Sequence, residues 1–298
     1  MEIRTLRYFL EVAREENMTR AAEILHISQP ALSKQLKSLE EELGKKLFTR
    51  HSFSIKLTDE GILLKKRAED LVLLADRIKN EFISLDDITG GELYLGLAES
   101  YQIQYLAREI SSLKKQYPSL KYSISSGDSE QVLEKLDKGL LDFVVLAELP
   151  DTTKYESLIF PYSDKWGVVM PDDVPLSKKK TIHVDDLISL PLFCSGQAWI
   201  NDIPRWAKDK MDKLHLEGSF KLSYNASFFA KEHLGYLLTF DKLIDTSPGS
   251  GLVFRPLDPQ LETNLYLVWK KYQTFSPIAE LFLKQITENF KKADYTDV

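Results

Sequence analysis

The sequence predicts three parts in order: a small and mainly helical N-terminal part, one long helix, and a larger α/β part at the C-terminus. Short helical patterns fill the first 58 residues, no glycine or proline interrupts residues 62–87, and strand and helix patterns alternate from residue 90 onward. A chain of 298 residues is also longer than one hydrophobic core usually supports. We therefore place the domain boundaries at residues 1–58, 59–89 and 90–298.

The composition is that of an ordinary globular protein. Apolar residues make up 43% of the chain and charged residues 28%, which excludes disordered, collagen-like and membrane compositions. No run approaches the roughly 18 apolar residues of a membrane helix, and the start does not resemble a secretion signal. We therefore expect a cytoplasmic protein with no membrane partner. The single cysteine, Cys194, cannot form an internal disulfide or a cysteine-based zinc site.

Three short helical patterns fill the first 44 residues. Helical spacing gives the first pattern an apolar face made of Leu6, Phe9, Leu10 and Ala13. Thr19 is the expected N-cap of a second helix over residues 20–25, and Ser28 is the expected N-cap of a third. Pro30 fits the first turn of the third helix, because the N–H that proline lacks would be unpaired there.

The third helix has an apolar side and a polar side. Its inward-facing leucines are Leu32, Leu36, Leu39 and Leu43. Gly44 ends this helix, and residues 48–50 and 55–57 read as two short strands around a polar tip. Two short helices around a tight turn, followed by a two-stranded wing, predict a winged helix-turn-helix.

The charge distribution is uneven along the chain. The net charge of −6 argues against general nucleic-acid coating, but a local basic face can be hidden in such a total. Between Lys34 and Lys56 there are six basic residues and three acidic ones, so this segment carries a local basic excess. Helical periodicity alone leaves open a three-helix packing unit whose lysines are merely solvated.

The literal order of residues is more specific than the periodicity. It reads Ala21-Ala22-(x)2-Leu25-(x)2-Ser28-Gln29-Pro30-Ala31-Leu32-Ser33-(x)-Gln35-(x)3-Leu39-Glu40-(x)2-Leu43-Gly44-(x)2-Leu47-Phe48-(x)-Arg50, closed by Leu57-Thr58-(x)2-Gly61. This order closely resembles the DNA-binding signature of LysR-type transcriptional regulators. The resemblance implies that the helix beginning at Gln29 enters the major groove of operator DNA while the wing reaches the flanking backbone.

The resemblance also implies roles for particular side chains. The positions from which the family reads base edges are occupied here by Gln29, Pro30 and Ser33. Phosphates are expected to be held, by charge type, by Lys34, Lys37 and Arg50. For Gln29 the alternative is a purely helix-capping role. Residues 52–54 read Ser-Phe-Ser where many family members carry arginine or lysine, so we expect weaker wing contacts.

Residues 59–89 are predicted to form a dimerisation helix that begins after a cap at Thr58. Its apolar positions alternate spacings of four and three, which is typical of a coiled-coil seam. The seam consists of Leu64, Ala68, Leu71, Ala75, Ile78, Phe82 and Leu85. A helix packed on its own chain would also need an apolar stripe, but a narrow seam with charged surroundings favours a second long helix. We predict a homodimer, and the resemblance implies antiparallel pairing and association into a homotetramer.

The C-terminal part begins after Thr89-Gly90-Gly91. Strand patterns at 92–97, 121–125 and 141–146 alternate with helical patterns at 104–116 and 130–138, which predicts a mostly parallel α/β sheet. Further apolar runs, at 166–170, 190–194, 235–240 and 265–270, precede a final helix over 277–290. This part resembles, more loosely, the family's effector domain, which has a periplasmic-binding-protein-like fold. Its subdomains are expected at about 90–161 with 268–298, and at about 162–267.

In such folds a ligand binds between the two halves, near the carboxyl ends of strands and near helix N-termini, where free N–H groups favour anions. We therefore expect a small-molecule effector of anionic character. The candidate pocket residues are Ser100, Tyr101, Gly127, Asp128, Ser129, Ser195, Gly196, Gln197 and Thr239. Each of them has a helix cap or a turn as its alternative role. Bulky Tyr236 and Phe240 near Thr239 predict a narrowed or apolar pocket.

Other classes of protein are less well supported. The five histidines lack metal-ligand spacing, and the sequence has neither a Gly-x-Ser-x-Gly elbow nor a Walker loop, so we expect no catalytic residues, metal or cofactor. Cys194 beside Ser195 is a redox-sensor candidate, with an inert buried cysteine as its alternative. A transport solute-binding protein would need an export signal and would have no use for residues 1–58.

The sequence therefore predicts a sequence-specific DNA-binding transcription regulator that a small-molecule effector modulates by shifting the population of its closure states. RNA polymerase is a further candidate partner. The remaining alternative is a cytoplasmic small-molecule-binding protein without a transcriptional role.

Overall fold

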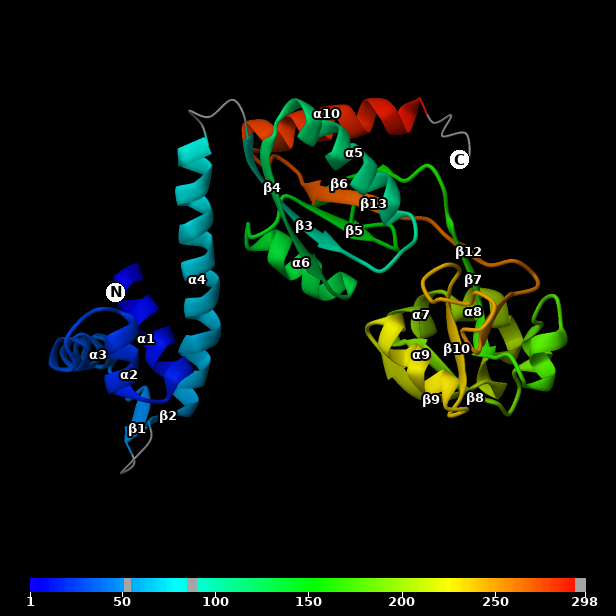
Figure 1. Ribbon diagram of the computed structural model, residues 1–298, viewed down its shortest axis with the longest axis horizontal. Helices are drawn as coiled ribbons and strands as arrows, with labels where there is room; N and C mark the ends of the chain where they lie inside the picture. The colour runs from blue at the N-terminus through cyan, green and yellow to red at the C-terminus, as the bar shows by residue number, and fades with distance from the viewer. Residues whose placement is uncertain (51–54, 85–89, 293–298) are drawn as a thin grey trace. The chain divides into compact units, whose positions relative to one another are not determined.

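The computed structural model of the chain describes residues 1–50, 55–84 and 90–292. The chain divides into two compact units, Met1–Asp86 and Asp87–Val298 (Figure 1). Each unit has buried apolar clusters of its own. Among the described residues, no helix combines the length and the apolar character needed to cross a membrane.

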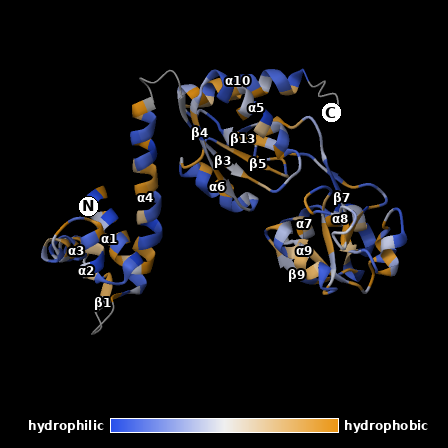
Figure 2. Cartoon of the chain, viewed as in Figure 1, coloured by the Kyte–Doolittle hydropathy of each residue, from blue (hydrophilic) through white to orange (hydrophobic). Residues whose placement is uncertain are grey.

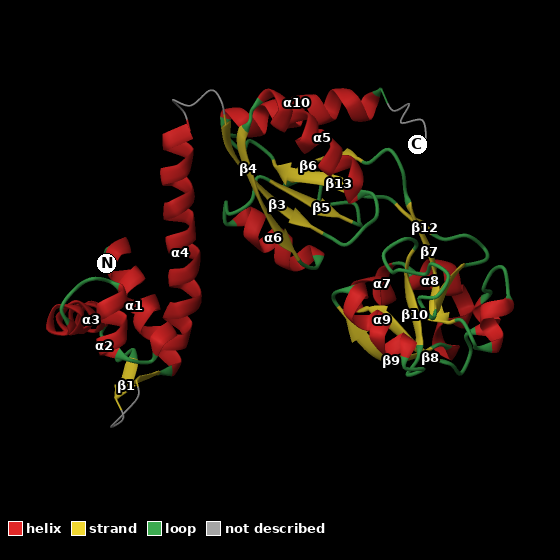
Figure 3. Ribbon diagram, viewed as in Figure 1, coloured by secondary structure: helices red, strands yellow, loops and turns green. Residues whose placement is uncertain are grey.

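The first unit is mainly helical (Figure 3). Its elements are α1 Ile3–Glu15, α2 Met18–Ile24, α3 Gln29–Leu43, β1 Phe48–Arg50, β2 Ile55–Leu57 and α4 Asp59–Ser84. The two strands pair antiparallel, with Thr49 opposite Lys56. The structure thus confirms the predicted winged helix-turn-helix and the long helix that follows it.

The third helix begins and ends on the predicted residues. The Ser28 hydroxyl accepts a hydrogen bond from the N–H of Ala31 at 3.4 Å, and Gly44 follows the helix in the left-handed region at φ +64°. Leu32, Leu36 and Leu39 are buried, but Leu43 is 40% exposed because the helix end extends beyond the core. The apolar side of the helix therefore stops one turn earlier than predicted.

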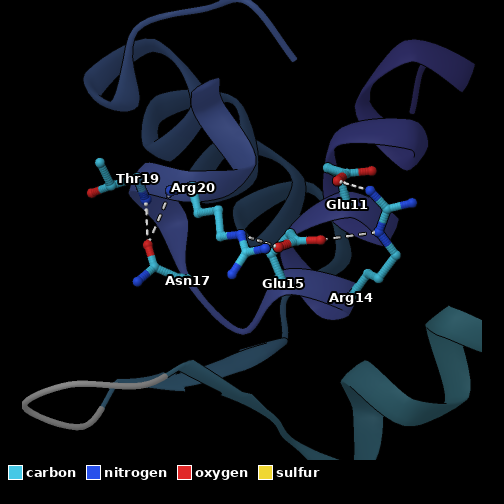
Figure 4. A network of polar contacts seen from close by, with 6 residues as sticks. All are labelled: Glu11, Arg14, Glu15, Asn17, Thr19 and Arg20. Carbon is cyan, nitrogen blue, oxygen red and sulfur yellow. Dashed lines mark hydrogen bonds and ion pairs between the residues drawn. The ribbon is translucent and has the colours of Figure 1, made fainter. Parts of the chain in front are cut away.

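The second helix begins earlier than predicted, because its cap is Asn17 and not Thr19. The Asn17 side-chain oxygen accepts hydrogen bonds from the N–H groups of Thr19 and Arg20, both at 3.0 Å (Figure 4). These donors have no carbonyl partner one turn earlier, so the cap satisfies them. Glu15, the last residue of α1, joins α1 to this turn through Arg20 of α2 at 2.8 Å, and it also lies 3.2 Å from its neighbour Arg14.

Removal of this cap is expected to destabilise the first unit. Asn17→Ala should lower the free energy of unfolding by about 1 kcal/mol, since two N–H groups lose their acceptor. Thr19→Ala is the matched control at the neighbouring exposed position, and it should change stability by less than about 0.5 kcal/mol. Urea unfolding followed by circular dichroism measures both values, and an equal loss in the two variants would contradict Asn17 as the cap.

The second unit contains two mixed sheets. The first sheet has the strand order β4-β3-β5-β13-β6, with strands β3 Gly90–Leu97, β4 Ser119–Ser126, β5 Phe143–Leu146, β6 Tyr155–Ile159 and β13 Tyr266–Lys270. Its helices are α5 Ile103–Gln116, α6 Ser129–Asp137 and α10 Pro277–Lys291. The central strands are coloured as hydrophobic in Figure 2, whereas the outer sides of α6 and α10 are largely hydrophilic.

The second sheet has the strand order β11-β7-β10-β8-β9, with β12 also paired to β7. Its strands are β7 Asp164–Pro171, β8 Pro191–Ser195, β9 His215–Phe220, β10 Tyr236–Phe240, β11 Leu252–Pro256 and β12 Glu262–Thr263. Its α-helices are α7 Gly196–Asn201, α8 Ile203–Ala207 and α9 Ser223–Lys231.

The prediction of mostly parallel strands is confirmed, with one reversed strand in each sheet, β13 in the first and β7 in the second. β3 runs parallel to β4 and β5, but β13 runs antiparallel to β5 and β6. β7 is likewise antiparallel to β10 and β11. The reason is that the chain crosses between the sheets twice, from β6 to β7 and from β12 to β13, without a crossover helix. Backbone bonds join the two crossings, with Phe160 N–H to Leu265 O at 2.8 Å and Trp166 N–H to Leu261 O at 3.0 Å.

Candidate DNA-binding surface and effector cavity

The N-terminal half of α3 presents a polar surface. Gln29, Pro30, Lys34 and Lys37 are exposed, and Ser33 is half-buried. Lys37 Nζ lies 3.6 Å from a Glu41 carboxylate oxygen. In the part of the chain that the structure describes, Lys34 forms no ion pair. This surface therefore offers hydrogen-bonding groups and positive charge to a partner without any rearrangement of the core beneath it.

The start of the wing is attached to the same helix by Glu40. One oxygen of its carboxylate accepts the N–H groups of Leu47 at 2.8 Å and Phe48 at 3.4 Å, and the other lies 2.8 Å from Lys46 Nζ. Burial would raise the pKa of Glu40, but the bonds from Lys46 and Leu47 outweigh burial and hold this pKa below its ordinary value. α3 and the wing are thus held together as one surface.

Arg50, the predicted phosphate-binding residue of the wing, is the last residue of β1. The predicted wing tip at residues 52–54 lies outside the described residues. The motif glycine Gly61 allows a close approach, because a Cβ atom there would lie 2.2 Å from the Leu47 carbonyl oxygen. The first turn of α4 can therefore pack on the segment that leads into the wing.

The predicted seam of α4 divides into two parts. Ala68 is fully buried in the core of its own unit, and Leu64 packs against that core. Leu71, Ile78 and Phe82 are exposed to 39%, 47% and 69%. Together with Ala75 they lie within roughly 60° of helical arc at about 100° per residue. Leu85 lies outside the described residues. The first two seam residues, Leu64 and Ala68, therefore pack within their own chain, as in the alternative interpretation. From Leu71 onward the apolar stripe is exposed in the single chain.

The second unit contains a cavity of about 680 Å³. The carboxyl ends of β3, β4 and β5 border it on one side, and β8, α7, α9 and β10 border it on the other. The cavity is lined by seven of the predicted pocket residues, namely Gly127, Asp128, Ser129, Ser195, Gly196, Gln197 and Thr239. The predicted pocket residues therefore include residues from both sides of this cavity.

Ser100 and Tyr101 do not line this cavity, so the structure does not bring them together with the other seven predicted pocket residues. The Ser100 hydroxyl accepts the Gln102 N–H at 2.9 Å. Tyr101 lies over a separate hollow of about 130 Å³, with Lys242 Nζ 4.5 Å from its ring centroid. The loop after β3 turns these side chains toward the start of β7, and Glu99 takes their expected place.

Glu99 and Glu148 were missed as cavity residues. The Glu99 carboxylate accepts the Ser223 N–H at 2.6 Å, and the Glu148 carboxylate accepts the Asn201 side-chain amide at 3.3 Å. Asp128 pairs with Lys221 at 2.8 Å in a third contact across the cavity. The sequence did contain a signal for these two residues. The last residue of β3 and the last residue of β5 each begin the same triplet, Leu-Ala-Glu, at the sheet edge where ligands of such folds bind.

The apolar part of the cavity is aromatic. Trp166 and Phe240 are buried and pack edge to face, with ring centroids 4.5 Å apart. The Trp166 indole N–H donates to the Thr263 hydroxyl at 2.9 Å, which holds the indole in place. Thr239 is also buried, and its hydroxyl donates to the Ser223 hydroxyl at 3.0 Å. The cavity thus joins an aromatic floor to polar walls.

Cys194 is fully buried beneath this region. Burial raises the pKa of its thiol far above the ordinary value, and the charge of Asp202 raises it further. Reactive thiolate is therefore scarce, and the structure favours the inert alternative over a redox sensor. Among the described residues no three His, Cys, Asp or Glu side chains form a cluster that could hold a metal ion.

A winged helix-turn-helix joined to a two-sheet ligand-binding unit defines the class of DNA-binding transcription regulators. Residues 3–62 match the family described as "Bacterial regulatory helix-turn-helix protein, lysR family", and residues 87–291 match the "LysR substrate binding domain". The chain belongs to the LysR family.

Similar proteins include two of Bacillus subtilis (strain 168). The HTH-type transcriptional regulator YtlI is 28% identical over 264 residues, which cover 86% of this chain and 83% of that protein. The uncharacterized HTH-type transcriptional regulator YybE is 26% identical over 300 residues, which cover 98% and 100%. Full-length CbnR complexed with its target DNA has the same fold, with a TM-score of 0.77, 19% identity, and coverage of 97% of this chain and 99% of that one.

Proposed function

We propose that this regulator reads operator DNA with the exposed N-terminal half of α3 and that a small molecule in the cavity of the second unit modulates this binding. The observation that carries the proposal is the α3 surface itself, where Gln29 and Lys34 are exposed on a helix with a fully packed core behind it. Base edges are contacted by Gln29, Pro30 and Ser33. Phosphates are contacted by Lys34, Lys37 and Arg50, which position the protein without reading sequence.

The effector acts by a shift between closure states of the two sheets. Its site is the cavity, whose two sides are joined by the contacts of Glu99 with Ser223, Asp128 with Lys221, and Glu148 with Asn201. A ligand that contacts both sides binds one closure state of the two sheets more tightly than the others. Only this difference in affinity between closure states shifts their populations. By linkage, operator DNA changes the affinity for the effector by the same factor.

The regulator works as a homodimer that is paired through the helix of residues 59–89. The apolar stripe of Leu71, Ala75, Ile78 and Phe82 supports this pairing, and two copies of α3 on a two-fold axis suit two half-sites of DNA. Association of dimers into a homotetramer, and contact with RNA polymerase, follow the family pattern and belong to the same proposal. A protein that binds operator DNA in this way acts in the cytoplasm.

Gln29→Ala tests the DNA-binding surface. The variant should bind its operator about tenfold to a hundredfold more weakly and should lose selectivity, because one bidentate base contact contributes roughly 1–3 kcal/mol. Protection of the DNA upstream of the protein's own coding region, measured at several salt concentrations, reports both quantities. Gln116→Ala, at an exposed position of α5, is the matched control and should protect DNA as the wild type does.

Two outcomes would count against the proposal. Selective protection that is the same in wild type and Gln29→Ala would remove the base-reading role from this residue and leave a capping role. Absence of selective protection by the wild type at every salt concentration would favour a ligand-binding protein without a transcriptional role.

A further inference from the structure

The side chains around the cavity carry an excess of negative charge. The carboxylates that line it are those of Glu99, Asp128, Glu130, Glu148 and Asp202. Lys221 is the one cationic side chain among the lining residues, all of which lie in the described part of the chain. Its ammonium group is already paired with Asp128 at 2.8 Å. Asp202 is paired with Arg205 at 3.1 Å, so among the described residues the lining carboxylates without a cationic partner are Glu99, Glu130 and Glu148.

Three of these carboxylates lie together because of the sheet register. β3 is paired with β4 and β5 in parallel, and Leu97 lies opposite both Ser126 and Val145. Glu99, Asp128 and Glu148 each follow the end of one of these strands two residues beyond the last strand residue. A cationic group placed among carboxylates that share one edge is attracted by each of them.

The far wall adds to this crowding. Asp202 is only 7% exposed, and burial raises its pKa. The hydrogen bond from Thr263 and the charge of Arg205 oppose this rise, and the charge of Glu148 adds to it. The Asp202 carboxylate accepts hydrogen bonds from Thr263 at 2.8 Å and from Arg205 at 3.1 Å. Glu148 therefore faces a second carboxylate across the cavity, in addition to its neighbours on the strand ends.

The free N–H groups at the helix N-termini were the basis for expecting an anionic effector. At this cavity the chain's own side chains already accept hydrogen bonds from these N–H groups. Asp128 caps α6 by accepting the Gln131 N–H at 3.0 Å. Glu99 accepts the first N–H of α9, that of Ser223. The Ser195 hydroxyl caps α7 at 3.2 Å from the Ala198 N–H. An anionic ligand would have to displace two carboxylates to reach these groups.

We propose that the effector is a small organic cation, with an ammonium or guanidinium group among Glu99, Glu148 and Asp202 and an apolar body against Trp166 and Phe240. This inference rests on the proposed function, in which the cavity is the effector site. Charge-assisted hydrogen bonds to carboxylates are about twice as strong as neutral ones, and an aromatic floor attracts a cation as well as an apolar body. The cavity of about 680 Å³ is within the usual range for ligands of drug-like size or smaller.

The test compares probes that share a body and differ in the sign of their charge. Full-length protein is titrated calorimetrically with phenethylammonium against phenylpropionate, and with agmatine against glutarate. In at least one pair the cation should bind, at least about tenfold more tightly than its anionic counterpart. Glu148→Gln should weaken the bound cation about tenfold, because the variant keeps the shape and loses the charge. Glu280→Gln, at an exposed position of α10, is the matched control and should bind as the wild type does.

Failure of this inference can be told apart from failure of the proposed function. Tighter binding of an anion in either pair, or no binding of either cation at about 10 mM, overturns the cationic class. An affinity that is unchanged in Glu148→Gln overturns the assigned position and leaves the carboxylates as contacts that only hold the two sheets together. DNA protection is measured on the same samples, and a cation that binds in the cavity without changing protection supports the ligand class and overturns the effector role.

Discussion

Phe82→Asp is expected to convert the proposed dimer into a monomer and to weaken operator binding at least about a hundredfold. Phe82 is 69% exposed in the single chain, so the change removes no intrachain packing. In a paired seam, however, the new aspartate would bury an unpaired carboxylate in each copy, and burial of such a group destabilises the dimer by several kcal/mol. Loss of the dimer also removes the second half-site contact, which otherwise binds at a high effective concentration. Sedimentation equilibrium and DNA titration measure the two effects.

Leu73→Asp is the control on the same helix. Leu73 is 52% exposed, but it lies about 180° around the helix from Phe82 at roughly 100° per residue. This variant should keep the mass and the DNA affinity of the wild type. If Phe82→Asp also kept both, the exposed stripe would not be the dimer interface. A loss in Leu73→Asp alone would move the interface to the opposite side of α4.

Asp164→Asn is expected to remove a large part of the pH dependence of stability. Asp164 is 2% exposed, and burial raises its pKa to about 6. The charge of Asp241 also raises this pKa, whereas Ser100 and Gln102 lower it. The folded state therefore holds the proton more tightly than the unfolded state, whose aspartate pKa is about 3.9. The stabilisation that comes from the protonated Asp164 carboxyl group is fully present well below pH 4 and is lost as the pH rises toward 6. At about 1.4 kcal/mol per pKa unit, the loss is about 3 kcal/mol.

The measurement is the free energy of unfolding of wild type and variant between pH 4 and pH 7. The difference between the two proteins should change by about 2 kcal/mol across this range, since part of the loss falls below pH 4, and it should be constant above pH 7. Asp209→Asn, at an exposed position, should show no such change relative to the wild type. A difference that does not vary with pH would mean that the Asp164 carboxylate titrates alike in the folded and unfolded chains.

The N-terminal unit could be predicted well because its signals are local. Ser28, Gly44 and the inward leucines act within one or two helical turns, and the structure confirms them with the exception of Leu43. Asn17 was missed because both Asn17 and Thr19 are good caps by residue type. Only the backbone geometry decides which side-chain oxygen reaches the free N–H groups.

The rest depended on long-range contacts that a single sequence does not show. β9 alternates exposed and half-buried residues, β6 contains Glu156 and Ser157, and the apolar part of β11 is only three residues long, so none of them shows a long apolar run. Ala68 looked like a seam residue because periodicity cannot tell a partner helix from the chain's own α1. Ser100 and Glu99 are adjacent in sequence, and only the turn after β3 decides which of them faces the cavity.

The two hydrogen-bonded crossings between the sheets have a mechanical consequence. A single linker would let one sheet swing and twist freely about the other, but two strands bonded side by side form a ribbon that bends about one axis and resists torsion. We therefore expect the opening angle to be the main coordinate of motion between the sheets. A ligand in the cavity, which is the proposed effector site, is then expected to change mainly this angle, and ligands of different size are expected to set it to different values.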